Sequence, residues 1–320
     1  MKHRNGDDIQ DTMFNGRNRK RLRPLPPISV VPTLLTLCNL LCGFAAIHYA
    51  AKPMDGNNFM ALSSLTIAGS LIFLGLFFDA IDGSVARLTR STSDLGAQLD
   101  SISDMVTFGV APAYMMLRLV SHYYGENGTL ILGPEADSAY AKVIWGVAAV
   151  YVCCTALRLA RFNVETPSAS TEDHSMFAGL PSPGAAGAIA SLIVLHQHGL
   201  SAWLGADDSM TFARISALGI PLITLLCALA MNSRLPYVHI AIRYLSGNRD
   251  ISYLIRIVVP CALAIFWFQE VLAIGFTAYA LSGPWHWLRS RMKGTDQSDP
   301  SIDMVSTHHQ QASENVHEHP

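Results

Sequence analysis

The chain has 320 residues, of which half are hydrophobic and only 14% are charged, and its mean hydropathy is positive. A composition this apolar excludes an ordinary soluble protein and favours several membrane spans. The formal net charge is only −2, so charge gives no sign of a nucleic-acid partner, and we expect none.

Polar segments are expected at both ends of the chain. Residues 1–27 are basic and finish with the stretch from Arg17 to Arg23. No small-residue cleavage site follows the next apolar run, so this arm is expected to be a cytoplasmic anchor that touches anionic lipid head groups, not a signal peptide. Residues 291–320 are expected to form a disordered cytoplasmic tail. Between them, residues 28–290 form the predicted transmembrane domain.

Eight apolar segments predict the fold class: an all-α integral membrane protein with a bundle of about eight transmembrane helices. The last two segments crowd each other around Gln269 and Glu270. They are therefore expected to form either a tight hairpin or one bent element. The expected segments are 30–50, 59–78, 98–120, 142–160, 180–199, 211–231, 252–268 and 269–287.

Basic residues are distributed unevenly between the two sides of this predicted bundle. With the N-terminus inside, the outer ends keep only four of them: Lys52, Arg118, Lys142 and Arg214. The remainder fall on the cytoplasmic side, as the positive-inside rule predicts for an even number of spans. We therefore expect a multi-pass protein with both termini in the cytoplasm.

A group of acidic residues joins the second and third segments. The pattern is D-x2-D-G-x2-A-R-x8-G-x3-D-x3-D, formed by Asp79, Asp82, Gly83, Ala86, Arg87, Gly96, Asp100 and Asp104. Charge at the edge of a bilayer core is expensive, so the pattern indicates a functional site. Residues three or four apart share one face of a helix. Four carboxylates converge here if the two helix ends meet.

The residue types in this pattern indicate chemistry at a phosphate. Carboxylates that close together repel one another, and one or two divalent cations remove the repulsion. Oxygen ligands without Cys or His favour Mg²⁺ or Mn²⁺, which also bind phosphate oxygens. Gly83 and Ala86 would let a ring or a phosphate approach the backbone, and Arg87 could bridge a phosphate or pair with an aspartate. The site is thus expected to catalyse metal-assisted transfer at a phosphate.

With every position matched, the pattern resembles the signature of the CDP-alcohol phosphatidyltransferase family. The resemblance implies an active site near the cytoplasmic surface, CDP-diacylglycerol as donor, and a homodimer in a bacterial inner membrane. It implies two Mn²⁺ or Mg²⁺ ions held by the aspartates, with Asp104 as the general base or as a ligand of the second ion. Contacts to the cytidine and phosphates would come from Asp82, Gly83, Ala86, Arg87 and Gly96.

Two polar residues in the first segment have two possible roles. Thr36 and Asn39 lie about one helical turn apart, four residues and seven residues after Pro32. Such side chains commonly form hydrogen bonds between membrane helices. The alternative is that they line the nucleotide site.

Three further stretches resemble the phosphatidylserine synthase branch of the family, which implies L-serine as acceptor and phosphatidylserine and CMP as products. They are Phe108–Ala113, Leu157–Asn163 and Phe177–Ala186. Pro112 in the first should kink its helix and free a carbonyl that needs a partner. In the second, Arg158, Arg161 and Asn163 are candidates for holding the acceptor's carboxylate or a lipid phosphate. Ordinary anchoring of a cytoplasmic helix end is the alternative role of the two arginines.

Other functions remain open from the residues alone. The acceptor could be glycerol 3-phosphate, inositol phosphate or choline. A transporter would place its charges nearer the bilayer midplane and often shows paired repeats. A catalytically inactive scaffold would be expected to have lost at least one motif position, and none is lost.

Overall fold

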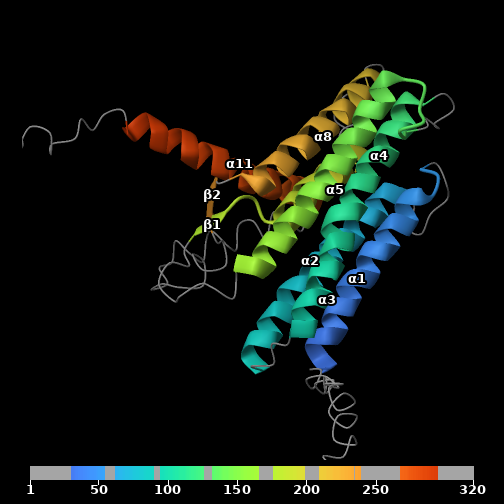
Figure 1. Ribbon diagram of the computed structural model, residues 1–320. Coiled ribbons are helices and arrows are strands. Elements are labelled where there is room, and N and C mark those ends of the chain that lie inside the picture. The colour runs from blue at the N-terminus through green and yellow to red at the C-terminus, as the bar shows by residue number, and fades with distance from the viewer. Residues whose placement is uncertain are drawn as a thin grey trace, which may run out of the picture.

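Almost all the residues that the structure describes are helical (Figure 1). This computed structural model describes residues 30–54, 62–89, 94–125, 132–165, 176–198, 209–233, 235–238 and 267–294. The helices are α1 (Val30–Ala51), α2 (Ser64–Thr89), α3 (Asp94–Asp104), η3 (Met105–Val110), α4 (Ala111–Tyr124), α5 (Ala139–Glu165), α6 (Ser182–His198), α8 (Ser209–Asn232) and α11 (Phe268–Gly294). Most of them run lengthwise in one bundle, from which α11 projects sideways.

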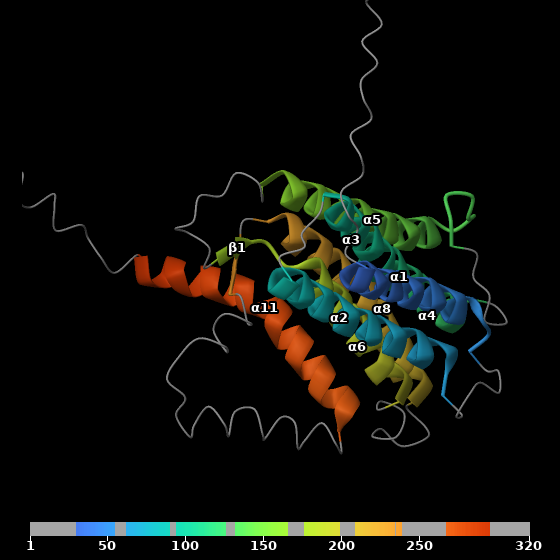
Figure 2. The ribbon, with the colours of Figure 1, turned by 90° about the horizontal axis from the view of Figure 1, so that it is seen from below.

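The observed helices match seven of the eight predicted segments, with α3, η3 and α4 forming one continuous segment. The remaining predicted segment, 252–268, lies outside the described residues except for its end. Whether 252–287 forms a hairpin is therefore not answered. The described part is one helix, α11, with Pro284 inside it. Figure 2 shows that α11 is bent, as a proline inside a helix predicts.

Among the helices of the described residues, four are long and apolar enough to cross a membrane, which makes this a multi-pass membrane protein. They comprise α1, residues Ser64–Val85 of α2, residues Ala139–Val164 of α5 and residues Ala213–Asn232 of α8. The predicted basic arm and polar tail fall outside the described residues, apart from the last turn of α11.

The second helix is longer than the sequence predicts. The apolar run ends at residue 78, but α2 continues to Thr89 and carries Asp79 and Asp82 within it. The motif contains no proline to stop the helix. In addition, Asp82 accepts a hydrogen bond from Thr36 on α1, so the polar part of α2 stays packed against its neighbour. Tertiary contact thus extends the helix past the hydropathy boundary.

Pro112 is accommodated by a π-helical stretch. Met105–Val110 forms η3, and the Ala111 N–H bonds to the carbonyl of Val106, five residues earlier. Pro112 then lies in the first turn of α4, where its missing N–H costs little. The carbonyl four residues before it, on Phe108, accepts a hydrogen bond of 2.9 Å from the hydroxyl of Tyr151 on α5. The expected partner for a freed carbonyl is therefore a side chain of a neighbouring helix.

The segment just before α6 takes part in a two-stranded ribbon. The strands β1 (Met176–Ala178) and β2 (Pro236–Val238) pair antiparallel. Gly179 follows with φ 86°, and a Cβ there would collide with the carbonyl of Met231, so only glycine fits. Burial raises the pKa of Tyr237 to about 12, and its protonated hydroxyl donates to the carbonyl of Ala280 on α11 at 3.0 Å. The ribbon thereby joins α6, α8 and α11.

The packing of α1 against its neighbours depends on small residues. A Cβ on Gly43 of α1 would collide with the backbone and side chain of Thr107 in η3. The Thr107 hydroxyl instead donates to the carbonyl of Asn39 at 2.9 Å. Absence of a side chain at residue 43 therefore lets the two helices approach closely enough for this bond.

We expect Gly43→Ala to destabilise the protein by about 1–3 kcal/mol, because the added methyl group forces α1 away from η3. The measurement is the thermal unfolding midpoint of the purified protein in detergent. Gly219→Ala on α8 is the matched control, since nothing lies within 4 Å of a Cβ at that glycine. Its midpoint should stay the same or rise. An equal fall for both variants would contradict the packing argument.

Candidate metal and catalytic site

Two helices contribute the four motif aspartates. Asp79 and Asp82 lie one turn apart on α2, and Asp100 and Asp104 lie one turn apart on α3. The α2 helix ends, and α3 begins, at the same end of the bundle, the lower end in Figure 1. Only four residues of sequence separate the two helices, and both pairs of aspartates lie near this end.

Three of these carboxylates form a compact set. One carboxylate oxygen from each of Asp79, Asp82 and Asp100 lies within 4.8 Å of the other two. Oxygens at that spacing can share one cation, and hard oxygen ligands suit Mg²⁺ or Mn²⁺. Asp82 is buried, and the other two are partly buried. This set is called the aspartate triad below.

The electrostatics of the triad favour a bound cation. Asp79 is repelled by both Asp100 and Asp82, and burial weakens the screening of that repulsion by water. Among the described residues, Oδ1 of Asp100 is buried and has no hydrogen-bond partner. A buried carboxylate oxygen without a partner is costly unless a ligand or a water satisfies it. The residues present therefore fit a divalent metal ion.

Asp104 is not a member of the triad but lies against it. Its residue is buried, with 7% exposed, as is Asp82 of the triad. The Nδ2 group of Asn39 on α1 donates to Asp104 Oδ1 at 3.1 Å. Of the other three aspartates, Asp79 repels it most strongly. Asp104 therefore lies against the triad but is oriented by a side chain of α1.

Thr36 performs the equivalent function for the triad. Its hydroxyl lies 3.0 Å from Asp82 Oδ2 and also 3.0 Å from the carbonyl of Pro32. The sequence left open whether Thr36 and Asn39 bond another helix or line a nucleotide site. Both form hydrogen bonds to another helix, and in both cases the partner is a motif aspartate.

Two residues that the sequence did not single out complete this contact. Ser103 donates to the carbonyl of Thr36 at 3.1 Å, and Thr107 donates to the carbonyl of Asn39. Both hydroxyls are fully buried. A Ser or Thr in a helix often bonds its own helix, as Ser101 does to Ala97, so the sequence held no signal that distinguished these two.

The expected nucleotide-contacting residues lie close to the aspartates in the chain. Gly83 follows Asp82 directly on α2 and is partly buried. Gly96 lies in the first turn of α3, one turn before Asp100. Ala86 and Arg87 belong to the last turns of α2, and their side chains lie outside the described structure.

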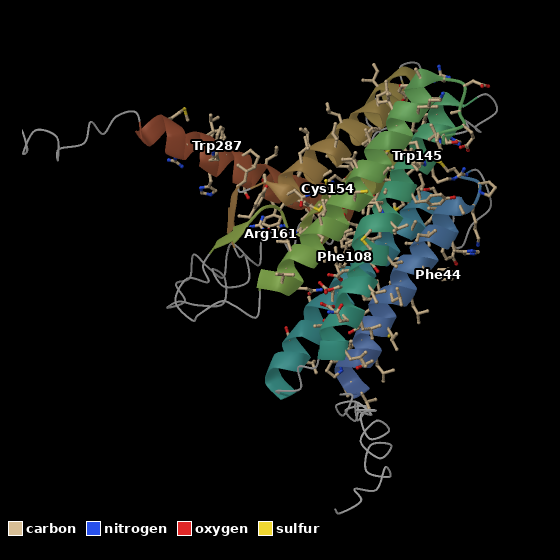
Figure 3. All side chains as sticks on the ribbon, viewed as in Figure 1. Phe44, Phe108, Trp145, Cys154, Arg161 and Trp287 are labelled. Atoms are coloured by element: carbon tan, nitrogen blue, oxygen red, sulfur yellow. The ribbon has the colours of Figure 1, made fainter. Side chains whose placement is uncertain are left out.

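The three residues predicted to bind the acceptor have different surroundings in the structure. Asn163 on α5 donates to the hydroxyl of Ser101, the neighbour of Asp100, at 2.9 Å. Arg158 instead donates to the carbonyl of Met231 at the end of α8, at 3.1 Å. Arg161 is exposed near the lower end of α5 (Figure 3). The hydrogen bond of Asn163 thus joins α5 to the helix that carries Asp100 and Asp104.

The comparisons with known proteins agree with this site. The sequence profile of the family described as CDP-alcohol phosphatidyltransferase matches residues 29–213, which include all four aspartates.

Several curated relatives carry the name CDP-diacylglycerol--serine O-phosphatidyltransferase. The chain is 27% identical to one from Helicobacter pylori over 265 residues, which cover 83% of this chain and 94% of the relative. It is 31% identical to one from Bacillus subtilis over 49% of this chain and 71% of the relative. For a relative from Methanocaldococcus jannaschii the identity is 36%, over 50% of this chain and 58% of the relative.

The matched profile covers more than half of the chain, and it contains the helices that bring the aspartates together. This protein therefore belongs to the CDP-alcohol phosphatidyltransferase family.

Proposed function

We propose that this protein transfers the phosphatidyl group of CDP-diacylglycerol to the hydroxyl of L-serine and releases phosphatidylserine and CMP. The observation that carries the proposal is the aspartate triad, whose oxygens lie within 4.8 Å of one another at one end of the bundle. Family membership supports the donor and the reaction type. The names of the matched relatives support serine as the acceptor.

The triad would hold a divalent metal ion, in keeping with a metal-dependent family. We propose two ions of Mg²⁺ or Mn²⁺, with the triad supplying the protein ligands. When bound, such ions neutralise the diphosphate and stabilise the charge that develops on the departing CMP. Thr36 would orient Asp82 for this task through its hydrogen bond.

Asp104 would act as the general base. In the proposed reaction its carboxylate accepts the proton of the serine hydroxyl while the serine oxygen attacks the β-phosphorus of the donor. A new phosphorus–oxygen bond forms to serine, and the bond between the β-phosphorus and the oxygen of CMP breaks. The Asn39 amide occupies one oxygen of Asp104 and would hold the carboxylate in position.

Substrate contacts are proposed from placement around the triad. Gly83, Ala86, Arg87 and Gly96 would contact the cytidine and the phosphates. In place of a direct nucleotide contact, Thr36 and Asn39 would position the carboxylates. Arg161 and Asn163 would receive the carboxylate of serine, since Asn163 is bonded to the neighbour of Asp100. Arg158 would serve mainly to anchor α8.

The proposal extends to the setting of the enzyme. The catalytic unit would be residues 28–290, placed in the cell membrane as a homodimer with the aspartates facing the cytoplasm. Excess basic charge at that end of the predicted bundle supports the orientation. Nucleotide-activated lipid would then reach the triad from the cytoplasmic surface.

Acceptor identity is tested by CMP release from CDP-diacylglycerol with purified protein and Mn²⁺ or Mg²⁺. We expect release that depends on both L-serine and metal. Glycerol 3-phosphate, inositol phosphate and choline are the comparison acceptors. Release with one of these in place of serine would keep the family reaction and overturn the assignment of Arg161 and Asn163.

Asp104→Asn is expected to lower kcat by about 10²–10⁴-fold, because the amide cannot accept the proton of the serine hydroxyl. The measurement is steady-state CMP release, with thermal unfolding as the check on folding. Asp137→Asn, at an exposed loop position, is the control and should keep full activity. Near wild-type turnover by Asp104→Asn would remove Asp104 as the base.

The two hydrogen bonds from α1 should have separable effects. Thr36→Val removes the donor to Asp82, so Mn²⁺ affinity should fall by about 10–100-fold. Asn39→Leu removes the donor to Asp104, so kcat should fall while Mn²⁺ affinity is retained. Mn²⁺ binding is measured by electron paramagnetic resonance without substrate, and kcat by CMP release at saturating metal. Equal loss of metal affinity in both variants would show that Asn39 also serves the triad.

A further inference from the structure

The C-terminal part of α11 leaves the bundle after a bend. Pro284 lies inside the helix, and the two halves of α11 point in different directions in Figure 2. The first half packs along α6. The second half extends away from the other helices, and Trp287 lies on this outer part (Figure 3).

Side-chain contacts fix the direction of the first half. A Cβ on Gly187 of α6 would collide with Phe276, and one on Gly184 would collide with Tyr279. The residue numbers rise on α11 as they fall on α6, so the two helices are antiparallel. Moving toward the bend, α11 therefore approaches the start of α6.

The start of α6 lies at the end of the bundle that carries the aspartates. Leu180, just before α6, bonds to Ala230 near the end of α8. Arg158 on α5 bonds to the same end of α8, and Asn163 on α5 reaches the helix of Asp100. The α11 helix thus bends at the level where the bundle presents its catalytic site, which is the level of a membrane surface.

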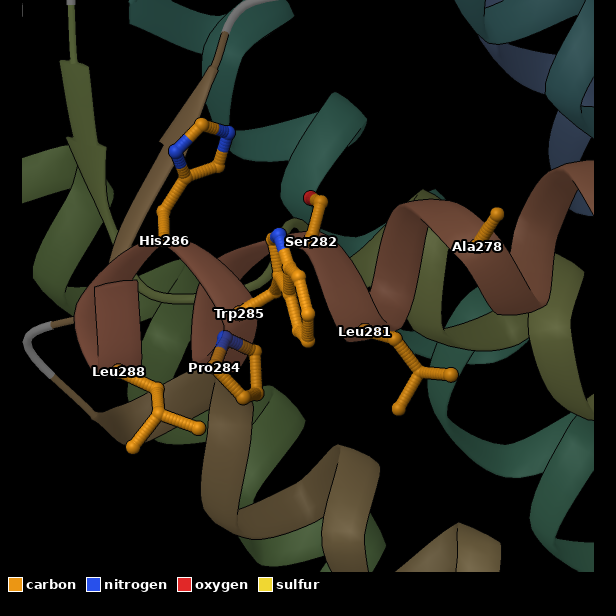
Figure 4. A pocket seen from close by; sticks show the side chains of 7 residues that line it. All are labelled: Ala278, Leu281, Ser282, Pro284, Trp285, His286 and Leu288. Atoms are coloured by element: carbon orange, nitrogen blue, oxygen red, sulfur yellow. The ribbon is translucent and has the colours of Figure 1, made fainter.

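One face of the bent region is apolar and uncovered. Leu281, Trp285, Leu288 and Met292 are spaced four, three and four residues apart, and each is between 46 and 62% exposed. A groove of about 460 Å³ runs along this face. Figure 4 shows Trp285 beside Pro284 in the groove, with Leu281 and Leu288 on either side. This apolar stripe continues past the point where the bundle stops covering α11.

One exposed basic residue lies in the stretch that carries the stripe, and two more follow in the sequence. Arg289 follows Leu288 and is exposed, and the same stretch of helix includes Arg291 and Lys293. A tryptophan-bearing apolar stripe beside basic residues is typical of helices that lie in the plane of a membrane interface. A second copy of the chain fits less well, because a two-fold contact through this face would bring the same basic residues together.

We propose that Pro284–Gly294 lies in the membrane interface beside the catalytic end, with the apolar groove holding acyl chains and the basic residues binding anionic lipid head groups. The surface is a lipid contact separate from the substrate site. It would hold α11, and through Tyr237 the strand ribbon, against an anionic membrane.

The interfacial placement is tested by measuring how deeply Trp285 lies in the membrane. The full-length protein keeps Trp285 while Trp145, Trp203, Trp267 and Trp287 are changed to Phe. It is reconstituted in phosphatidylcholine vesicles with bromine placed near the head group or near the end of the acyl chain. Bromine quenches tryptophan on contact. We expect the shallow bromine to quench Trp285 more strongly.

The matched control is Ile274→Trp in the same protein with all five native tryptophans changed to Phe. Ile274 is an exposed residue on the first half of the same helix. Its tryptophan should be quenched more strongly by the deep bromine. Absence of quenching of Trp285 by either lipid, or stronger quenching by the deep one, would overturn the interfacial placement.

The anionic preference is tested with brominated phosphatidylglycerol against brominated phosphatidylcholine at equal mole fraction in mixed vesicles. We expect stronger quenching of Trp285 by the anionic lipid. Arg289→Gln should lower the preference by up to about fivefold, as one basic side chain near a membrane surface contributes. The Ile274→Trp protein should show no preference. Equal quenching of Trp285 by both lipids would overturn the anionic part of the proposal.

Discussion

Repulsion between carboxylates is the constraint on which this structure depends. Asp79, Asp82 and Asp100 lie within 4.8 Å of one another, with Asp104 against them, in a region from which the membrane helices exclude much of the water. Such a cluster is costly in the absence of a cation. A bound metal ion would remove the repulsion and at the same time bind a diphosphate.

The α1 helix is what holds the repelling groups together. Thr36 and Asn39 donate to carboxylates on two different helices, and their own carbonyls accept from Ser103 and Thr107. These four side chains thus find partners across a helix interface, as an apolar surrounding favours. The missing side chain of Gly43 permits this close contact. The polar interface positions the site and stabilises the bundle at the same time.

A second set of contacts organises the remainder of the catalytic end. Arg158 and the Gly179 turn both meet the end of α8, and Tyr237 of the strand ribbon bonds to α11. These contacts fix where α6 begins and where α11 bends. The elements that hold the aspartates and the elements that would touch the lipid surface are therefore joined through backbone carbonyls. That of Met231 lies at the end of α8, and that of Ala280 lies four residues before Pro284 in α11.

Much of this protein could be predicted from its residues alone, because the two strongest signals are local. Apolar runs predict seven of the observed helical segments, and the spacing of the aspartates places each pair on one helix face. The motif also predicts the family and the oxygen-only metal chemistry. Among the described residues, hydropathy ended α2 too early, because polar residues continue that helix, and it gave no sign of the short strand β1.

The partners of the polar groups could not be predicted in this way. Ser103 and Thr107 look like any helical hydroxyls, and nothing local shows that they bond α1 and not their own helix. Asp104 and Asp82 accept from different residues of α1, and Arg158 and Asn163 donate to different helices. These differences depend on which faces of distant helices meet. The local sequence determines a residue's chemistry and its helical face, whereas its contacts depend on how helices far apart in the chain pack.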